Sequence, residues 1–490
     1  MLFDSKVPTM MDEVFRRYWL RIEDERVRRA KDMHAWLVND RESIVRQVRS
    51  SMMKMFRPKT VRRMSVRVLN VVPRVVSRLA KVYKAPPDRV LDGGVTYAVA
   101  DGGERTAVES KGNKVYRKLL DGSTIDRRMK EAEQQALYFN TVLVQPRWLD
   151  DAGGGRMDYV VHNPAFTVVE WDENDFYKPR AMYFPAYRTI DGRPELVLVY
   201  WSATEHYYVR KNNTKVVVPG MSGMENPYGV FPAAVLRVTE TADGWGDGMW
   251  DLVDGNLECC EQVTNISYTA KFQTHGQAVA VNMGLKGEPE IGPDRTLAVD
   301  DKTGSTVQPN FFFANANPNI EAVQGLVDWM LRTLQNIRGI SGSTMSLDAN
   351  MQSGVSKIQD SAELMEQRQD FVGTLTQFEA DLFAATRQVW NYHNDNQKIP
   401  DESVFSVKYP DPKIIKSVDE KTREREFGLK NNTMSHIDII MEDNPHMTEA
   451  DAAERFDKII AERRRINDRY GFFDSTPAGA INNPDTTATS

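Results

Sequence analysis

The sequence predicts an α+β fold in which long helices frame small β-rich regions. Apolar residues recur every three or four positions through residues 250–270, 320–337 and 354–390, which is the spacing of a helix face. Short β-branched and aromatic runs, separated by Gly, Asp, Asn and Pro, fill residues 141–236 and recur within residues 278–319. A chain of 490 residues is long enough for about two to four domains.

The composition is that of an ordinary globular protein, with 27% charged and 41% hydrophobic residues. A net charge of −6 excludes a nucleic-acid binder of the strongly basic kind. The sequence contains no run of eighteen apolar residues and no charged start followed by an apolar stretch. We therefore expect no membrane span and no secretory signal. Cys259 and Cys260 are adjacent, and neighbours on a helix point about 100° apart, so we expect structural thiols in a reducing cytoplasm.

The N-terminal part is predicted to be helical and becomes strongly basic. Residues 10–40 have apolar side chains on one helical side. Residues 41–84 contain thirteen Lys and Arg against the single acid Glu42. Two interpretations stay open: a solvated helix face balanced by acids elsewhere, or a surface that meets phosphates or an acidic partner. The candidate partner-facing residues are Arg57, Lys59, Arg62, Arg63 and Arg67.

The region from residue 91 to residue 236 is predicted to run from loop to helix to sheet. Residues 91–113 are rich in Gly and Asp and are expected to form a loop. Residues 114–140 have the spacing of one helix. The β pattern of residues 141–236 indicates an α+β domain, in which Asp191-Gly192 is a hairpin turn.

The stretch from residue 250 to residue 396 organises the chain: a helix, a small insert, a second helix, a polar loop and one very long helix. Gly255 costs about 1 kcal/mol against Ala, so the first turn of the first helix is expected to be weak. The wide apolar face around Trp329 in the second helix indicates contacts on two sides. The Gly- and Pro-rich insert 278–319 is too small for a core of its own, so we expect it to pack against copies of itself.

After the long helix the pattern predicts a strand and then several helices. The strand covers residues 404–409, and a charged helix covers residues 417–430. Ser435 and Thr448 are expected to start the last two helices, with Ser435 as an N-cap. Residues 474–490 lack apolar periodicity and are expected to be a disordered tail.

No motif for catalysis or cofactor binding is found. Phosphate-binding Gly-rich loops, Cys-x-x-Cys pairs and nucleophile elbows are all missing from the sequence, and no two His are paired at helical spacing. The acidic group Glu170, Asp172, Glu173 and Asp175 is better explained by a turn between strands than by a cation site. We therefore expect no cofactor, no metal and no catalysis, although a catalytic carboxylate pair without a motif stays an open alternative.

Five ordered segments resemble the portal protein family of tailed bacteriophages. They are residues 70–87, 162–175, 226–238, 250–353 and 409–445. Their order and distances extend the resemblance over most of residues 60–460.

The resemblance implies a portal fold and divides the chain into the regions of that family. These are 1–248, the wing with N-terminal helices and an α+β region; 249–277, the first stem helix; 278–319, the clip; 320–340, the second stem helix; 341–353, the tunnel loop; 354–415, a long wing helix and strand; 416–473, the crown; and 474–490, the tail.

The function that the resemblance implies is a ring of about twelve copies at one capsid vertex, with a channel for double-stranded DNA. Expected partners are other copies of the chain, the DNA, the terminase large subunit, the head–tail adaptor, and the major capsid and scaffolding proteins, without a membrane. The portal would be assembled in the host cytoplasm and would then reside in the virion. DNA would enter through it during packaging and leave through it during ejection.

The resemblance also implies roles for particular residues. In the tunnel loop these are Ser341, Gly342, Ser343, Thr344, Ser346, Asp348, Asn350 and Gln352. Stem residues that could face the channel are Lys271, Arg332 and Arg338. Clip residues that could dock the motor and the adaptor are Lys286, Glu288, Glu290, Asp294 and Arg295.

Two other functions stay open from the residues alone. One is a metal-dependent DNA-processing enzyme, such as a nuclease, with scattered carboxylates that bind Mg²⁺. The other is a monomeric or dimeric virion scaffold protein whose basic stretch 41–84 binds an acidic partner. Stoichiometry separates the second from a portal, because a portal must close a ring.

Overall fold

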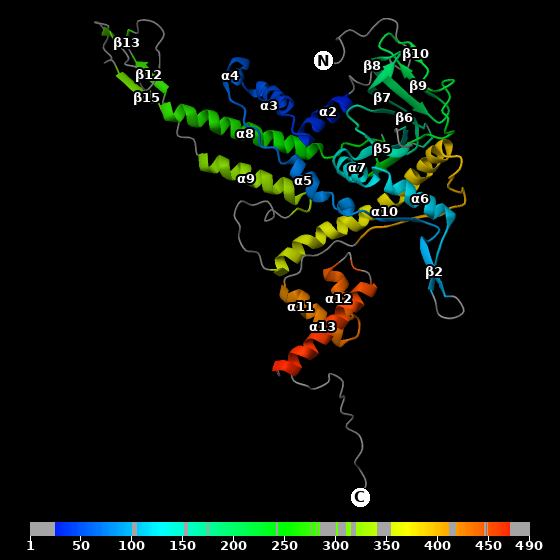
Figure 1. The fold of residues 1–490 in the computed structure, drawn as a ribbon. Coiled ribbons are helices and arrows are strands. Elements are labelled where there is room, and N and C mark those ends of the chain that lie inside the picture. The colour runs from blue at the N-terminus through cyan, green and yellow to red at the C-terminus, as the bar shows by residue number, and fades with distance from the viewer. Residues whose placement is uncertain are drawn as a thin grey trace. The chain divides into compact units, whose positions relative to one another are not determined.

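The computed structural model describes residues 25–99, 105–150, 155–172, 174–175, 177–241, 244–275, 277–281, 283–284, 300–301, 310–314, 320–340, 354–410, 418–444, 447 and 449–470. The chain divides into two compact units, Met1–Pro412 and Lys413–Ser490. Helices and sheets are mixed in the first unit, and helices make up the described part of the second (Figure 1). The predicted α+β class is confirmed.

The helices of the first unit are α2 (Glu25–Leu37), α3 (Arg41–Met55), α4 (Pro58–Arg63), α5 (Val72–Leu79), the 3-10 turn η1 (Val82–Lys84), α6 (Lys111–Asp121), α7 (Ile125–Phe139), α8 (Trp250–His275), α9 (Ile320–Asn336) and α10 (Gly354–His393). The three long helices predicted after residue 250 are confirmed as α8, α9 and α10. Helix α9 ends at Asn336, four residues before the predicted boundary, because Gly339 adopts a positive φ of 64°.

The strands form several antiparallel sheets: β1 (Asp88–Leu91) with β16 (Phe405–Lys408); β2 (Val95–Val99) with β3 (Arg105–Glu109); β4 (Thr141–Leu149) between β5 (Arg156–His162) and β11 (Ala234–Arg237); β12 (Gln277–Val281) with β15 (Asn310–Ala314); and β13 (Met283–Gly284) with β14 (Asp300–Asp301). A five-stranded sheet has the order β10 (Lys215–Val216), β9 (His206–Val209), β8 (Arg193–Ser202), β7 (Pro179–Ile190) and β6 (Val168–Trp171).

The hairpin turn at Asp191-Gly192 is confirmed. Ile190 pairs with Arg193 in the β7–β8 register, so the loop has two residues. Both turn residues have positive φ, 51° for Asp191 and 77° for Gly192, as a twisted two-residue hairpin requires.

Two sequence predictions in the first unit are wrong. Residues 91–113 are not one loop, because β2 and β3 form a hairpin there. The Gly and Asp that indicated a loop occupy a tight turn, in which Gly93 and Gly94 have positive φ, and the strand begins immediately after it. Residues 114–140 are not one helix either. Ser110 caps α6, which starts at Lys111, and the chain breaks at Gly122 before α7 begins.

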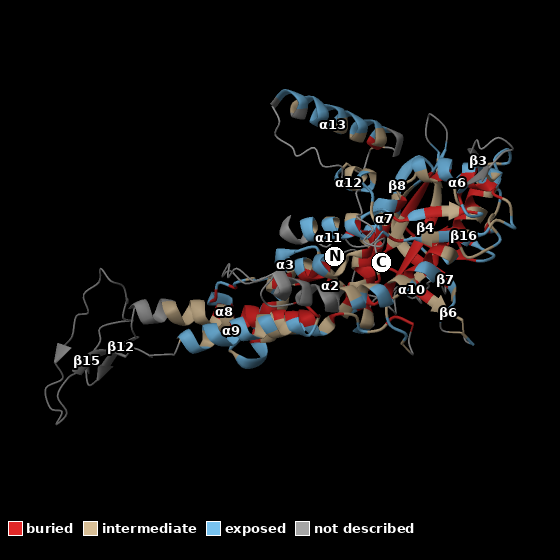
Figure 2. Cartoon of the chain, turned by 90° about the horizontal axis from the view of Figure 1, so that it is seen from below, coloured by how far each residue is buried: buried red, intermediate tan, exposed pale blue. Residues whose placement is uncertain are grey.

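The core of the first unit lies where α7 and α10 pack on the sheet of β4, β5 and β11. Met129 and Ala136 of α7 share this core with Leu375 and Leu382 of α10 and with Val144 of β4. Figure 2 shows this region as a concentration of buried residues. Strand β1 pairs with β16, which lies more than 300 residues later in the chain: Leu91 pairs with Phe405. This pairing closes the same core at its edge.

A buried ion pair joins β1 to α10. The Arg89 guanidinium donates from Nε to Glu379 Oε2 at 2.9 Å and from Nη2 to Oε1 at 2.7 Å. Tyr83 donates its hydroxyl to the same carboxylate at 2.7 Å. Burial alone would lower the pKa of Arg89, but the Glu379 charge and its hydrogen bonds raise that pKa overall. Both side chains are almost fully buried, so each charge depends on the other.

The second unit contains α11 (Val418–Lys430), α12 (His436–Asp443) and α13 (Glu449–Tyr470). Ser435 is the predicted N-cap of α12 and forms a capping box with Asp438. Arg425 and Lys421 of α11 bind Asp443 at 2.6 and 3.0 Å. The hydrogen bond from Arg425, followed by that from Lys421, lowers the pKa of Asp443 to about 2. The predicted tail 474–490 lies outside the described residues.

Gly248, at the entrance to α8, is required for close approach of two backbone segments. Its φ is +59°, and a Cβ there would lie 2.4 Å from the carbonyl oxygen of Tyr138, which accepts a hydrogen bond from Met249 N. We expect Gly248→Ala to lower the free energy of unfolding by about 1–3 kcal/mol, measured by urea denaturation. Gly192→Ala is the matched control, because Gly192 also has positive φ but no atom within 4 Å of the added Cβ. Equal losses in the two variants would contradict the steric argument.

Candidate functional site: the α8–α9 helical pair

Helices α8 and α9 run antiparallel and in close contact. Gly255 near the start of α8 faces Leu334 near the end of α9, and a Cβ on Gly255 would lie 2.6 Å from Leu334 Cδ2. Arg338, just after α9, makes an ion pair with Asp251 at the same end of the pair. Gly255 therefore lies at a close helix contact, whereas the sequence pattern indicated only a weak first turn.

One side of α8 is a ladder of polar side chains that holds an extended segment. Asn256 Oδ1 accepts from Val71 N at 3.0 Å, Cys260 Sγ accepts from Leu69 N at 3.3 Å, and Thr264 Oγ1 accepts from Arg67 N at 2.9 Å. The three side chains are spaced by four residues, so they lie in one row along the helix. This row satisfies backbone groups that would otherwise be buried without partners. The sequence predicted a structural thiol at Cys260 but did not predict the ladder.

The outward side of α9 is apolar and uncovered in the described chain. Leu326 and Trp329 are 43% and 61% exposed. The side of α9 that faces α8 is buried at Val327 and half-buried at Leu334. Figure 2 shows the exposed side of α9 beside the buried residues of α8. We call Leu326 and Trp329 the α9 stripe. Exposed aromatic and aliphatic side chains in one row are typical of a contact surface.

The two stem cations that the structure describes are both paired. Arg332 binds Asp328 at 2.8 Å one helical turn away, and both side chains are exposed. Arg338 binds Asp251 across the helix pair. The predicted channel role of these residues stays a prediction, and the pairing reduces the positive charge that they present.

Several predicted site residues lie outside what the structure describes. The tunnel loop 341–353 and the clip residues from Lys286 to Arg295 are outside the described residues, as is the side chain of Lys271. The basic candidates Arg57, Lys59, Arg62 and Arg63 are described and exposed on α4 and the turn before it. Arg67 instead lies against α8 and donates from Nε to Ser267 Oγ at 3.2 Å.

The acidic group and the two cysteines that the sequence analysis considered for chemistry make structural contacts in the described part of the chain. No cluster of three or more His, Cys, Asp or Glu suited to a metal is found there. Asp172 accepts from Asn174 N and Asp175 from Tyr177 N, so these acids form a turn between β6 and β7, as predicted. Burial raises the pKa of Cys259 to about 12 and that of Cys260 to about 11, so both thiols are protonated at neutral pH.

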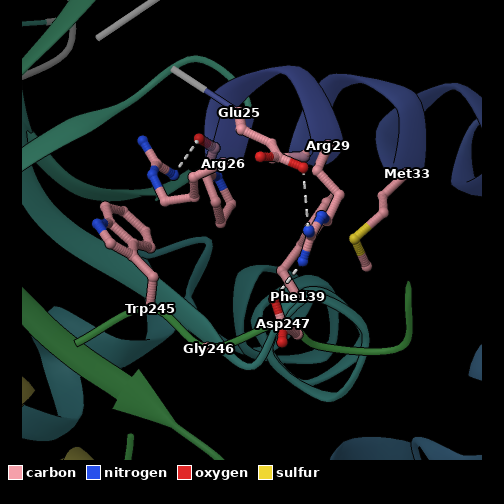
Figure 3. A pocket seen from close by; sticks show the side chains of 10 residues that line it. Glu25, Arg26, Arg29, Met33, Phe139, Trp245, Gly246 and Asp247 are labelled. Atoms are coloured by element: carbon pink, nitrogen blue, oxygen red, sulfur yellow. Dashed lines mark hydrogen bonds and ion pairs between the residues drawn. The ribbon is translucent and has the colours of Figure 1, made fainter. Parts of the chain in front are cut away.

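A small cavity of about 180 Å³ lies between the start of α2 and the segment that leads into α8 (Figure 3). Its cations are already engaged. Arg29 lies between Glu25 and Asp247, and Arg26 stacks 4.4 Å from the centroid of Trp245. These contacts join α2 to the entrance of α8. A larger cleft of about 660 Å³ lies beside α7, α10 and the end of α9. Neither was predicted from the sequence, because each is lined by distant segments.

Within the part of the chain that the structure describes, no helix is long and apolar enough to span a membrane.

Comparisons with known proteins give no family. No family model matches the sequence, and no curated protein matches it. Among solved structures, a chain of the virion of a native gene transfer agent particle is 12% identical, with a TM-score of 0.34, and the match covers 74% of this chain and 86% of that one. A chain from the neck of an empty gene transfer agent particle is 10% identical, with a TM-score of 0.31, over 74% of this chain and 84% of that one. Scores this low do not establish a shared fold.

Proposed function

We propose that this chain is a portal subunit that assembles with copies of itself into a closed ring around a channel for double-stranded DNA. The observation that carries the proposal is the α9 stripe, in which Trp329 is 61% exposed on a helix whose other side is packed. A ring gives each subunit two neighbours through a heterologous contact, so a helix with one face on its own chain and another on a neighbour fits it.

The order of elements supports the same proposal. Two antiparallel helices bracket a small insert in which β12 pairs with β15, and the 40-residue helix α10 begins after residues 341–353. This is the order that the portal resemblance implies for stem, clip, stem, tunnel loop and wing. The insert then docks the terminase large subunit during packaging and the head–tail adaptor afterwards.

The proposed subunit performs no catalysis, and its role is structural. It sits at one capsid vertex of the virion after assembly in the host cytoplasm, in contact with the major capsid and scaffolding proteins. DNA must slide through the channel, so the channel wall should present few unpaired cations, because each phosphate contact adds salt-dependent affinity. The pairing of Arg338 with Asp251 agrees with such a surface.

Shortening the loop by removing residues 343–351 is expected to leave ring assembly intact and to impair DNA retention or packaging. The loop is small and polar, so it suits a lumen rather than a subunit contact. Native mass spectrometry measures the ring, and the yield of DNA-filled particles measures retention.

Two results, one from the shortened variant and one from the wild-type ring, would each overturn part of the proposal. Loss of the ring in the shortened variant would make the loop an inter-subunit element. Incubation of the wild-type ring with duplex DNA and Mg²⁺ is the control for enzymatic activity. Metal-dependent cleavage that a carboxylate substitution abolishes would replace the portal role by a DNA-processing one.

A further inference from the structure

The described chain has a second uncovered face besides the α9 stripe. It follows the end of α3 and continues through α4. Met55, the last residue of α3, is 68% exposed there. Four exposed cations follow within seven residues: Arg57, Lys59, Arg62 and Arg63. None of the four makes an ion pair or a side-chain hydrogen bond within the described residues. We call these five residues the basic face.

The composition of the basic face is that of a protein contact rather than of a solvated helix. Protein interfaces are enriched in Met and Arg, whereas surfaces exposed to water favour mixed charges. Met is flexible and polarizable, so it adapts to the shape of a partner. The cations add long-range attraction for an acidic surface, since no acid of the described chain pairs with them.

The α9 stripe has the complementary chemistry. Glu321 and Asp328 are seven residues apart, so they lie in one row of α9, about a third of a turn around the helix from the row of Leu326 and Trp329. Glu321 is exposed and has no partner among the described residues, and Asp328 is 62% exposed in its pair with Arg332. The exposed surface of α9 therefore has an apolar row and, beside it, an acidic edge.

The two faces cannot meet within one chain. Helices α3 and α9 both pack on α8, and both views place them on different sides of it (Figures 1 and 2). Ser51 of α3 contacts Glu261 of α8, whereas Leu334 of α9 contacts Gly255. Two different faces of one molecule that match each other form a head-to-tail contact between copies.

We infer that the basic face of one copy docks against the α9 stripe of the next copy, and that this contact closes the ring. The inference rests on the proposed function and names the surfaces that would carry it. Met55 packs against the apolar row of the neighbour. The guanidinium groups of the basic face pair with the acidic edge that Glu321 and Asp328 form.

Charge reversal with rescue tests this contact. The full chain carrying Arg62→Glu and Arg63→Glu is expected to need about tenfold or more higher concentration for half-assembly, since like charges then face each other. Adding Glu321→Arg and Asp328→Arg to the same chain is expected to restore assembly. Arg180→Glu with Arg193→Glu is the matched control, because both residues are exposed on the five-stranded sheet, and its assembly is expected to equal the wild type.

The outcomes separate this inference from the proposed function. A wild-type chain that stays monomeric with its virion partners present overturns both. Rings formed equally well by wild type and by the Arg62→Glu, Arg63→Glu variant overturn the docking alone. Loss of assembly without rescue by the reversed acids also overturns it, because the basic face then meets another surface. Intact rings with lost binding of duplex DNA would make the face a DNA contact and overturn it as well.

Discussion

Replacing Trp329 by Glu is expected to abolish ring assembly while leaving the subunit folded. The Trp329 side chain is 61% exposed in the single chain, so its removal costs the subunit little. A buried Trp at the centre of a protein contact is typically worth about 2 kcal/mol or more, and the new charge opposes burial further. Each contact in the ring should therefore weaken about 30-fold or more, as measured by native mass spectrometry over a concentration series.

Tyr187→Glu is the control for this experiment. Tyr187 is 69% exposed on β7, so the substitution makes a similar change on a surface to which no contact is assigned. Both variants should unfold within about 0.5 kcal/mol of the wild type. Rings of normal stability in Trp329→Glu would show that α9 faces solvent in the assembly, and the proposal would lose its main support.

Replacing Arg89 by Met is expected to produce the largest loss of stability. Glu379 would keep a buried charge without its guanidinium partner, and breaking a buried pair on one side costs about 3–5 kcal/mol. The loss should appear as a lower midpoint in thermal unfolding followed by circular dichroism. It should affect the first unit, since β1 and α10 both belong to it.

Two controls define the cause of that loss. Arg28→Met should change the free energy of unfolding by less than about 1 kcal/mol, because Arg28 is 64% exposed and lies 3.8 Å from Glu25 and 3.6 Å from Asp32. Arg89→Met combined with Glu379→Gln should recover part of the stability, because a neutral amide replaces the unpaired charge and can still accept from Tyr83. A double variant less stable than Arg89→Met would show that the unpaired charge of Glu379 is not the main cause of the lost stability.

Local patterns were enough to predict the elements that organise this chain. The helices α8, α9 and α10 follow from apolar spacing over many turns, and the Asp191-Gly192 hairpin follows from turn chemistry. The hairpin of β2 and β3 was missed because its strands are short and follow a Gly-rich turn. The break at Gly122 was missed although the apolar spacing changes there, with a step of six residues from Leu119 to Ile125 in place of three or four.

The candidate site was less predictable, because it depends on contacts between distant residues. In the sequence, Asn256 and Thr264 are ordinary polar residues of a helix. Only the structure shows that they accept hydrogen bonds from the backbone of the segment 67–71. Glu379 reads as a surface residue of a long helix, although it is 1% exposed and paired with Arg89, 290 residues earlier. The breadth of the apolar face of α9, by contrast, was visible in the sequence; Leu326 and Trp329 are exposed in the described chain, and the contact predicted on that second side stays a prediction.

The mass and shape of the purified full-length protein test the central claim most directly. Native mass spectrometry with negative-stain electron microscopy at micromolar concentration, with and without scaffolding and capsid proteins, is the measurement. We expect closed rings of about a dozen copies with a central hole wide enough for duplex DNA. A monomer or dimer under both conditions would contradict the portal assignment.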